Sequence, residues 1–241
     1  MENAVTSPEP LLVAIDGPAG SGKSSVSRAA ADRLGFGILD TGAGYRALAW
    51  AMRAHGTELD DELAALEMLR DWRFRITMVG AQRVTVRLPA AAGSEESGEV
   101  DVTAAIRDHE ISGCVSRVSR HPEVRVRLNA LFRELVANSE LPGVVIEGRD
   151  TTTVIAPDAP VRILLTASPE VRAARRAGEL PGLSPAQVLE DLHARDAKDA
   201  LVVDFFTPAP GVTLVDTSDM SFEQSVQAVV DVVQMAQEGA R

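Results

Sequence analysis

Eight residues near the amino terminus have the types and the spacing of a phosphate-binding loop. They are Gly17, Pro18, Ala19, Gly20, Ser21, Gly22, Lys23 and Ser24, in the pattern G-x-x-x-x-G-K-S. Glycines let successive main-chain N–H groups turn toward phosphate oxygens, and a helix that begins at the lysine adds the positive end of its dipole. Lys23 supplies a charge for the outer phosphates, and the Ser24 hydroxyl is a ligand for Mg²⁺. The motif predicts binding of a nucleoside triphosphate with Mg²⁺.

The segments on either side of this loop have the required context. Residues 11–15 are a continuous apolar run, typical of a buried parallel strand, and residues 23–34 have a helical pattern. At average residue usage, a chance match to the motif has odds of about one per cent in a chain of this length. No Asn-Lys-x-Asp element for reading guanine follows, because Asn3, Asn129 and Asn138 precede Ala, Ala and Ser. The sequence thus favours a kinase over a GTPase switch protein.

A second polar segment follows the first predicted helix. Residues 40–46 come after a short predicted strand at residues 37–39, which would end at the carboxyl edge of the sheet, where ligands bind. Arg46 at that edge suits a clamp on the phosphate of an acceptor molecule. The alternative is a surface ion pair, which contributes little energy. The residue types by themselves leave both interpretations open.

Further buried-strand runs define the elements that must position these residues. They occur at residues 144–146, 163–165 and 212–215, with helical segments between them. Serine caps mark three further helix starts, at Ser168, Ser184 and Ser221, the last with Gln224 as a capping box. This alternation predicts a parallel sheet wrapped by helices, the three-layer α/β/α fold of P-loop NTPases. We expect one such core over residues 1–241.

One stretch departs from this alternation. Residues 73–79 and 83–88 alternate apolar and other side chains around a turn, as an antiparallel hairpin does, and residues 100–102 suit a third short strand. Residues 89–99 have no periodicity and are interpreted as a surface loop. We therefore expect a small antiparallel β insert over residues 71–104.

Composition excludes several classes of partner. A net charge of −11 over 241 residues disfavours binding to nucleic-acid polymers. No apolar run approaches the length that spans a bilayer, and the polar amino terminus does not resemble a signal peptide. Cys114 is the only cysteine, which excludes an internal disulfide and is typical of a reducing cytoplasm. We expect a cytoplasmic monomer that acts on small molecules, with no membrane partner.

Several blocks taken together resemble the bacterial cytidylate kinases. They are residues 15–18, 40–46, 147–150, 157–160, 165–168 and 195–196, in the order of that family. Other nucleoside monophosphate kinases share the phosphate-binding loop, but not both the Asp-Thr-Gly-Ala-x-Tyr-Arg and the Glu-Gly-Arg-Asp blocks. The predicted insert is similar to that family's enlarged nucleotide-binding subdomain. The resemblance implies that the γ-phosphoryl group of ATP is transferred, with Mg²⁺, to CMP or dCMP.

The resemblance also implies roles for individual residues. ATP would contact the loop residues 17–24, Ser25 and Arg175, and the catalytic residues would be Lys23, Arg149 and Arg195. The acceptor would be bound by Thr41, Arg46, Ser116, Arg125, Arg149, Asp150, Arg195 and Asp199. Among these, Arg46 and Arg149 would hold the acceptor phosphate. Ser116, Arg125 and Asp150 would lie nearest the base and sugar.

Residues 172–200 are expected to act as a helical lid that keeps water from the activated phosphate. Arg172, Arg175 and Arg176 are spaced to share one helix face, and the alternative is a solvated basic surface. Gly178 and residues 181–182 are the predicted flexible points. For Arg195 and Asp199 the alternative is a plain salt-bridge ladder with Asp191.

The chain also departs from the family's pattern. Val202 stands where an arginine of the lid is usual, Thr151 and Thr152 stand where Ile and Gly are usual, and Phe132 replaces a common Gln. Two alternatives to a cytidylate kinase follow. One is a kinase for another small acceptor, such as UMP or a non-nucleotide alcohol. The other is a protein that has lost catalysis and senses ATP or CMP.

Overall fold

The computed structural model describes residues 10–87, 98–179, 185–200, 204 and 206–239. The chain divides into two units, one made of residues 1–39 and 133–241 and one made of residues 40–132. The first unit contains the predicted phosphate-binding loop, and the second contains the segment around Arg46. Each unit has its own sheet.

A five-stranded parallel sheet forms the centre of the first unit. Its strands are β1 (Leu11–Asp16), β2 (Gly37–Asp40), β6 (Gly143–Gly148), β7 (Val161–Thr166) and β8 (Thr213–Asp216), in the order β2-β6-β1-β7-β8. The central strand β1 pairs with β6 from Leu11 opposite Gly143 to Asp16 opposite Gly148. The carboxyl ends of the two strands are therefore neighbours. This register places the loop after Asp16 beside the residues that follow Gly148.

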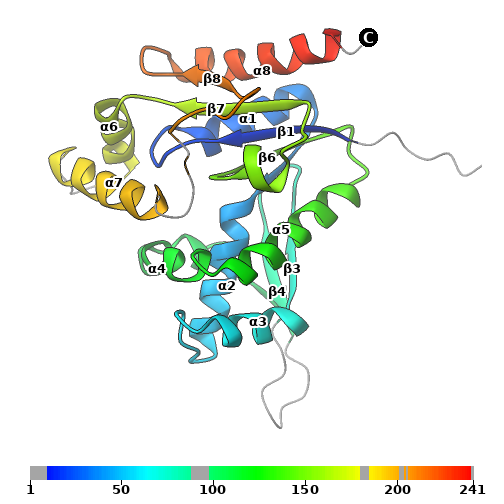
Figure 1. Ribbon diagram of the computed structural model, residues 1–241, viewed down its shortest axis with the longest axis vertical. Helices are drawn as coiled ribbons and strands as arrows, with labels where there is room; N and C mark the ends of the chain where they lie inside the picture. The colour runs from blue at the N-terminus through cyan, green and yellow to red at the C-terminus, as the bar shows by residue number, and fades with distance from the viewer. Residues whose placement is uncertain (1–9, 88–97, 180–184, 201–203, 205, 240–241) are drawn as a thin grey trace, which may run out of the picture. The chain divides into compact units, whose positions relative to one another are not determined.

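Helices cover this sheet as the sequence predicts (Figure 1). On one face, α1 (Lys23–Leu34) and α8 (Phe222–Gly239) pack against Val13, Ile15 and Ile163 in one apolar core. On the other face, Ala14 packs with Ala156 and Ala159, next to the single π-helical turn η2 (Thr151–Ile155). Helices α6 (Pro169–Glu179) and α7 (Pro185–Ala200) follow β7 and lie side by side. The P-loop α/β architecture is confirmed.

Two of the three predicted serine caps are present. The Ser168 hydroxyl accepts a hydrogen bond from the Val171 N–H at 3.3 Å, one residue before α6 begins. Ser221 and Gln224 cap each other, with the Ser221 N–H donating to Gln224 Oε1 at 2.8 Å and the Gln224 N–H donating to Ser221 Oγ at 3.2 Å. Ser184 lies outside the described residues. These contacts satisfy N–H groups that a helix end leaves without an intrahelical acceptor.

The second unit holds a three-stranded antiparallel sheet, as predicted. Its strands are β3 (Arg73–Ile76), β4 (Val84–Arg87) and β5 (Glu99–Asp101), with β4 in the middle. The hairpin strands are shorter than predicted, because the Thr77 hydroxyl donates to the Ala81 carbonyl and accepts from the Arg83 N–H. These two bonds begin the turn at residue 77. Of the predicted loop, residues 89–97 lie outside the described residues and Glu99 belongs to β5.

Helices of the second unit come before and after these three strands along the chain. Its elements are α2 (Thr41–Ala54), α3 (Glu62–Asp71), the 3₁₀ turn η1 (Ala105–Arg107), α4 (His109–Ser119) and the first part of α5 (Pro122–Ala137). Cys114 is half-buried on α4, with its thiol donating to the Ile111 carbonyl. None of the described helices combines the length and the apolar character that crossing a membrane requires.

Candidate active site

The loop between β1 and α1 has the backbone of a phosphate cradle. Gly20 and Gly22 have φ values of 75° and 84°, a left-handed conformation that favours glycine. A Cβ on Gly17 would lie 2.2 Å from the Leu165 carbonyl oxygen, so this position has no room for a side chain. Gly22 precedes α1, and no side chain caps that helix. The N–H groups of its first turn are therefore suited to an anion.

A carboxylate lies next to the predicted Mg²⁺ ligand. The Ser24 hydroxyl donates a hydrogen bond of 2.7 Å to Glu147 Oε1, and Glu147 is buried at the end of β6. Oxygen atoms of this kind are what Mg²⁺ binds, usually with phosphate oxygens and water completing the octahedron. Glu147 was not among the predicted site residues. The available signal was an acidic side chain at the end of an otherwise apolar strand within the Glu-Gly-Arg-Asp block.

The buried carboxylate of Asp16 joins this loop to the segment after β6. Thr151 donates its N–H at 2.8 Å and its hydroxyl at 2.6 Å to Asp16 Oδ1. Thr152 makes the same two bonds to Asp16 Oδ2, also at 2.8 and 2.6 Å. The two threonines that depart from the family's pattern therefore satisfy a charged group that would be costly to bury alone. They also hold the segment that carries Arg149 and Asp150.

Arg149 reaches the phosphate-binding loop directly. Its Nη1 donates to the Gly17 carbonyl at 2.9 Å, and Asp150 beside it is buried. Both residues thus lie at the carboxyl edge of the sheet, next to the predicted phosphate cradle. A guanidinium group in this place can stabilise negative charge on a phosphate bound in the loop.

The three arginines of α6 differ in their surroundings. Arg175 Nη1 donates to the Ser21 carbonyl at 3.1 Å, and Arg175 Nη2 donates to the Thr217 carbonyl at 2.8 Å. Arg172 is buried and forms an ion pair with Asp196 of α7. Arg176 is half-buried. The alternative of a solvated basic surface is therefore wrong for Arg172, because α7 covers it.

Other predictions for this region stay open. Arg195 and Asp199 belong to α7, but their side chains lie outside what the structure describes. Residues 181–182 and Val202 lie outside the described residues as well. Gly178 is exposed in the last turn of α6. The salt-bridge ladder and the function of residues 172–200 as a lid remain predictions.

In the second unit, Arg46 is held at the start of α2. Asp40 caps this helix by accepting from the Ala43 N–H at 3.0 Å, and its Oδ2 pairs with Arg46 Nη2 at 2.8 Å. The Arg46 side chain is only 21% exposed, and a Cβ on Gly42 would come within 2.9 Å of Arg46 Nη1. Glycine at position 42 therefore leaves room for the guanidinium group. An ion pair was the alternative given for Arg46 and it is present, but both side chains are mostly buried, so it is not a surface pair. Thr41, the residue after Asp40, is buried.

Two further predicted acceptor residues belong to α4 and α5. Ser116 is half-buried on α4. Arg125 is half-buried on α5, where its Nη1 donates to the carbonyl of Ser119 at 3.4 Å. Ser119 is the last residue of α4, and this contact between α5 and α4 was not predicted from the sequence.

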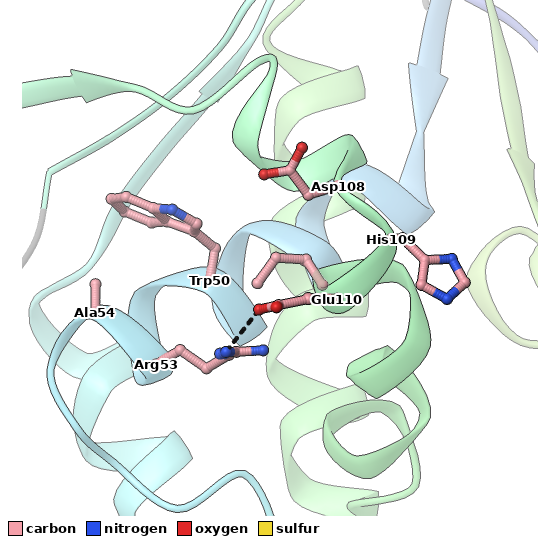
Figure 2. A pocket seen from close by; sticks show the side chains of 7 residues that line it. Trp50, Arg53, Ala54, Asp108, His109 and Glu110 are labelled. Carbon is pink, nitrogen blue, oxygen red and sulfur yellow. Dashed lines mark hydrogen bonds and ion pairs between the residues drawn. The ribbon is translucent and has the colours of Figure 1, made fainter.

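A surface pocket of about 540 Å³ in the second unit contains none of the predicted site residues. It is lined by Trp50, Arg53, Ala54, Asp108, His109, Glu110 and Ile111. Figure 2 shows the ion pair of Arg53 with Glu110, 2.9 Å long, at its edge. The pocket therefore offers no support for the predicted acceptor contacts.

Comparison with known proteins gives consistent results. A sequence profile described as "Cytidylate kinase" matches residues 13–235. A cytidylate kinase of Streptomyces avermitilis is 41% identical over 236 residues, which cover 97% of this chain and 97% of that protein. A cytidylate kinase of Cutibacterium acnes is 41% identical over 230 residues, covering 94% and 97%. One from Colwellia psychrerythraea is 38% identical over 226 residues, covering 91% and 94%.

Proposed function

Because the chain belongs to the cytidylate kinase family, we propose that it transfers the γ-phosphoryl group of ATP to CMP or dCMP, giving CDP or dCDP and ADP. The family match over residues 13–235 carries this proposal. The geometry of the first unit supports it, since a glycine-rich loop, a lysine and Arg149 meet at one edge of a parallel sheet. The enzyme is therefore a nucleoside monophosphate kinase.

The donor nucleotide would be held by the loop and by the first turn of α1. The N–H groups there and the Lys23 ammonium would contact the phosphates, with Ser25 and Arg175 as further contacts. Ser24 and Glu147, whose oxygens lie 2.7 Å apart, would hold Mg²⁺, directly or through water. When bound, Mg²⁺ neutralises charge on the β- and γ-phosphates and orients them. Oxygen donors on both side chains fit that ion.

The acceptor would be held by guanidinium groups and by short polar side chains. Arg46 and Arg149 suit its phosphate, because the planar guanidinium binds two phosphate oxygens at once. The pair with Asp40 keeps Arg46 in one orientation before the phosphate arrives. Ser116, Arg125 and Asp150 would select the base and sugar, with Thr41 and Asp199 as additional contacts.

The reaction does not require the protein to form a covalent bond with either substrate, and catalysis depends mainly on positioning and charge stabilisation. The attacking group is a phosphate oxygen of CMP that is already anionic, so no strong general base is required. Lys23, Arg149 and Arg195 would compensate the charge on the transferred group, and the surrounding residues would exclude water. Binding both nucleotides in line supplies most of the remaining rate enhancement.

A substrate panel tests this function. Purified protein is assayed for ADP release with CMP, dCMP, UMP, AMP and GMP as acceptors, and CDP formation is measured directly. We expect CMP and dCMP to be used far better than the purines. Similar turnover of CMP and AMP would contradict the assignment of the acceptor. Binding of ATP and CMP without any CDP would favour the alternative of a nucleotide sensor.

Arg125→Ala sharpens this test. We expect it to weaken the use of CMP relative to UMP and AMP, because Arg125 is proposed to contact the base. Arg127→Ala is the matched control, since Arg127 is exposed on the same helix. Equal effects of the two substitutions on the CMP preference would refute the role of Arg125. The cytoplasmic location and the monomeric state remain predictions, the second of which size-exclusion chromatography tests.

A further inference from the structure

Ala19 of the phosphate-binding loop is held by α6 and α7 through all three of its groups. Its N–H donates to Asp196 Oδ1 at 3.3 Å, and its carbonyl accepts from Arg172 Nη1 at 2.9 Å. Its methyl group is buried in a small apolar cluster with Ala173, Val188 and Leu192. The loop and the two helices are thus packed together at this residue.

The two charged side chains that hold Ala19 also pair with each other. Arg172 Nη1 donates to Asp196 Oδ2, and the two side chains are only 5% and 6% exposed. Each of these buried charges is stabilised by the other, since removing one group leaves the charge of the other buried without a counter-charge. A Cβ on Gly20 would lie 2.9 Å from the Arg172 carbonyl, so the main chains of the loop and of α6 also approach closely. No predicted role in catalysis accounts for this pair.

We propose that the Arg172–Asp196 pair is a positioning element. It fixes the rotation of α7 about its own axis relative to the phosphate-binding loop. This inference rests on the proposed function. Apolar contacts alone would anchor α7 without defining its register, whereas a carboxylate bound to one loop N–H and to one arginine is directional. A shift of α7 by one residue would turn it by about 100° and lose both bonds.

The register of α7 matters because this helix carries the proposed catalytic arginine. Arg195 precedes Asp196, and Asp199 follows one turn later on the same helix. Fixing Asp196 against Ala19 therefore also fixes where the backbone of both residues lies relative to the loop that grips ATP. The pair acts through Ala19 and α7 and is not expected to touch either substrate.

The test separates positioning from stability by comparing a single with a double substitution. Asp196→Asn leaves the Arg172 cation buried without its counter-charge, whereas Asp196→Asn combined with Arg172→Met removes both charges. For each variant, the melting temperature, the Kd of ADP by calorimetry and kcat/KM for CMP are measured. Val233→Ala, at a fully buried position of α8 in the main apolar core, is the control that lowers stability away from the loop.

We expect Asp196→Asn to lower the melting temperature and to raise the Kd of ADP by about tenfold or more, the effect of one lost hydrogen bond to a charged group. The double variant should recover melting temperature but neither ADP affinity nor kcat/KM. Val233→Ala should lower the melting temperature and change the kinetic constants by less than about twofold. Recovery of both stability and ADP affinity in the double variant would overturn the proposal, as would unchanged ADP affinity in Asp196→Asn.

These readouts also distinguish failure of the proposed function from failure of this inference. If the wild-type protein binds ADP but does not phosphorylate CMP, the assignment of the acceptor fails, while the Kd of ADP still tests the pair. If Asp196→Asn does not fold, the double variant alone decides. Full affinity for ADP in that folded double variant would then overturn the positioning role.

Discussion

Removing the hydroxyl groups of Thr151 and Thr152 should show how firmly Asp16 ties the Arg149 segment to the phosphate-binding loop. The substitutions Thr151→Val and Thr152→Val keep the shape of each side chain and leave the main-chain N–H bonds to Asp16 in place. Each removes a single bond of 2.6 Å to a buried carboxylate. The perturbation is therefore confined to two hydrogen bonds whose acceptor carries a charge.

The expected size of the effect follows from these contacts. A hydrogen bond to a charged group contributes about 1.5–3 kcal/mol, and the methyl group that replaces the hydroxyl recovers about 0.8 kcal/mol by its burial. Each substitution should therefore lower the free energy of unfolding by about 1–2 kcal/mol. The double variant should lose at least the sum, because Asp16 would keep only two N–H donors for its charge.

Urea unfolding followed by circular dichroism measures this loss, and Thr153→Val is the control. Thr153 belongs to the same π-helical turn but is exposed, so its substitution should change the free energy of unfolding by less than about 0.5 kcal/mol. The kinetic constants supply a second readout, since a looser Arg149 should lower kcat/KM for CMP. If Thr152→Val and Thr153→Val unfold at the same urea concentration, the reasoning about Asp16 is refuted.

Three further changes test other parts of the structure. Lys23→Ala should lower kcat by about 10²–10³-fold or more while the chain still folds, because the lysine compensates phosphate charge. Residual activity close to wild type would contradict this. Asp101→Asn should destabilise the second unit at pH 7, because hydrogen bonds from the Thr103 hydroxyl and N–H hold the pKa of Asp101 at about 2. That pKa is lower in the folded than in the unfolded state, so the contribution is complete above pH 4 and lost as pH falls through about 2. In urea titrations the difference between the wild type and Asp101→Asn should thus shrink below pH 4 and disappear below about pH 2, and a constant difference would exclude this cause. Gly44→Ala should lower the free energy of unfolding by up to about 2 kcal/mol, because the new Cβ would lie 2.7 Å from two ring carbons of Phe132. The cost of this crowding exceeds the gain of about 1 kcal/mol that alanine brings in helix propensity. Phe132→Leu in the same chain should reduce that loss, and equal losses in both backgrounds would speak against the clash.

Features of this protein whose conformation is set by residues adjacent in the chain could be predicted from the sequence. The phosphate-binding loop is contiguous, so its spacing alone indicates how the backbone must turn. The buried strands around residues 13, 145 and 164 were predicted from apolar runs, and the capping box of Ser221 and Gln224 spans three residues. The hairpin was predicted from its alternation, although its turn begins earlier because Thr77 binds across it.

Contacts between distant residues were decided by the tertiary structure. Glu147 meets Ser24 across 123 positions, Thr151 meets Asp16 across 135, and Asp196 meets Ala19 across 177. Local spacing does not predict such pairs, because the first two form where β1 and β6 align their carboxyl ends and the third forms where α7 packs on the loop. Sequence patterns therefore indicated which residues have the chemistry to bind nucleotides. The packing of β6, α6 and α7 onto the loop determined which carboxylates surround it, since burial requires each charged group to find a partner.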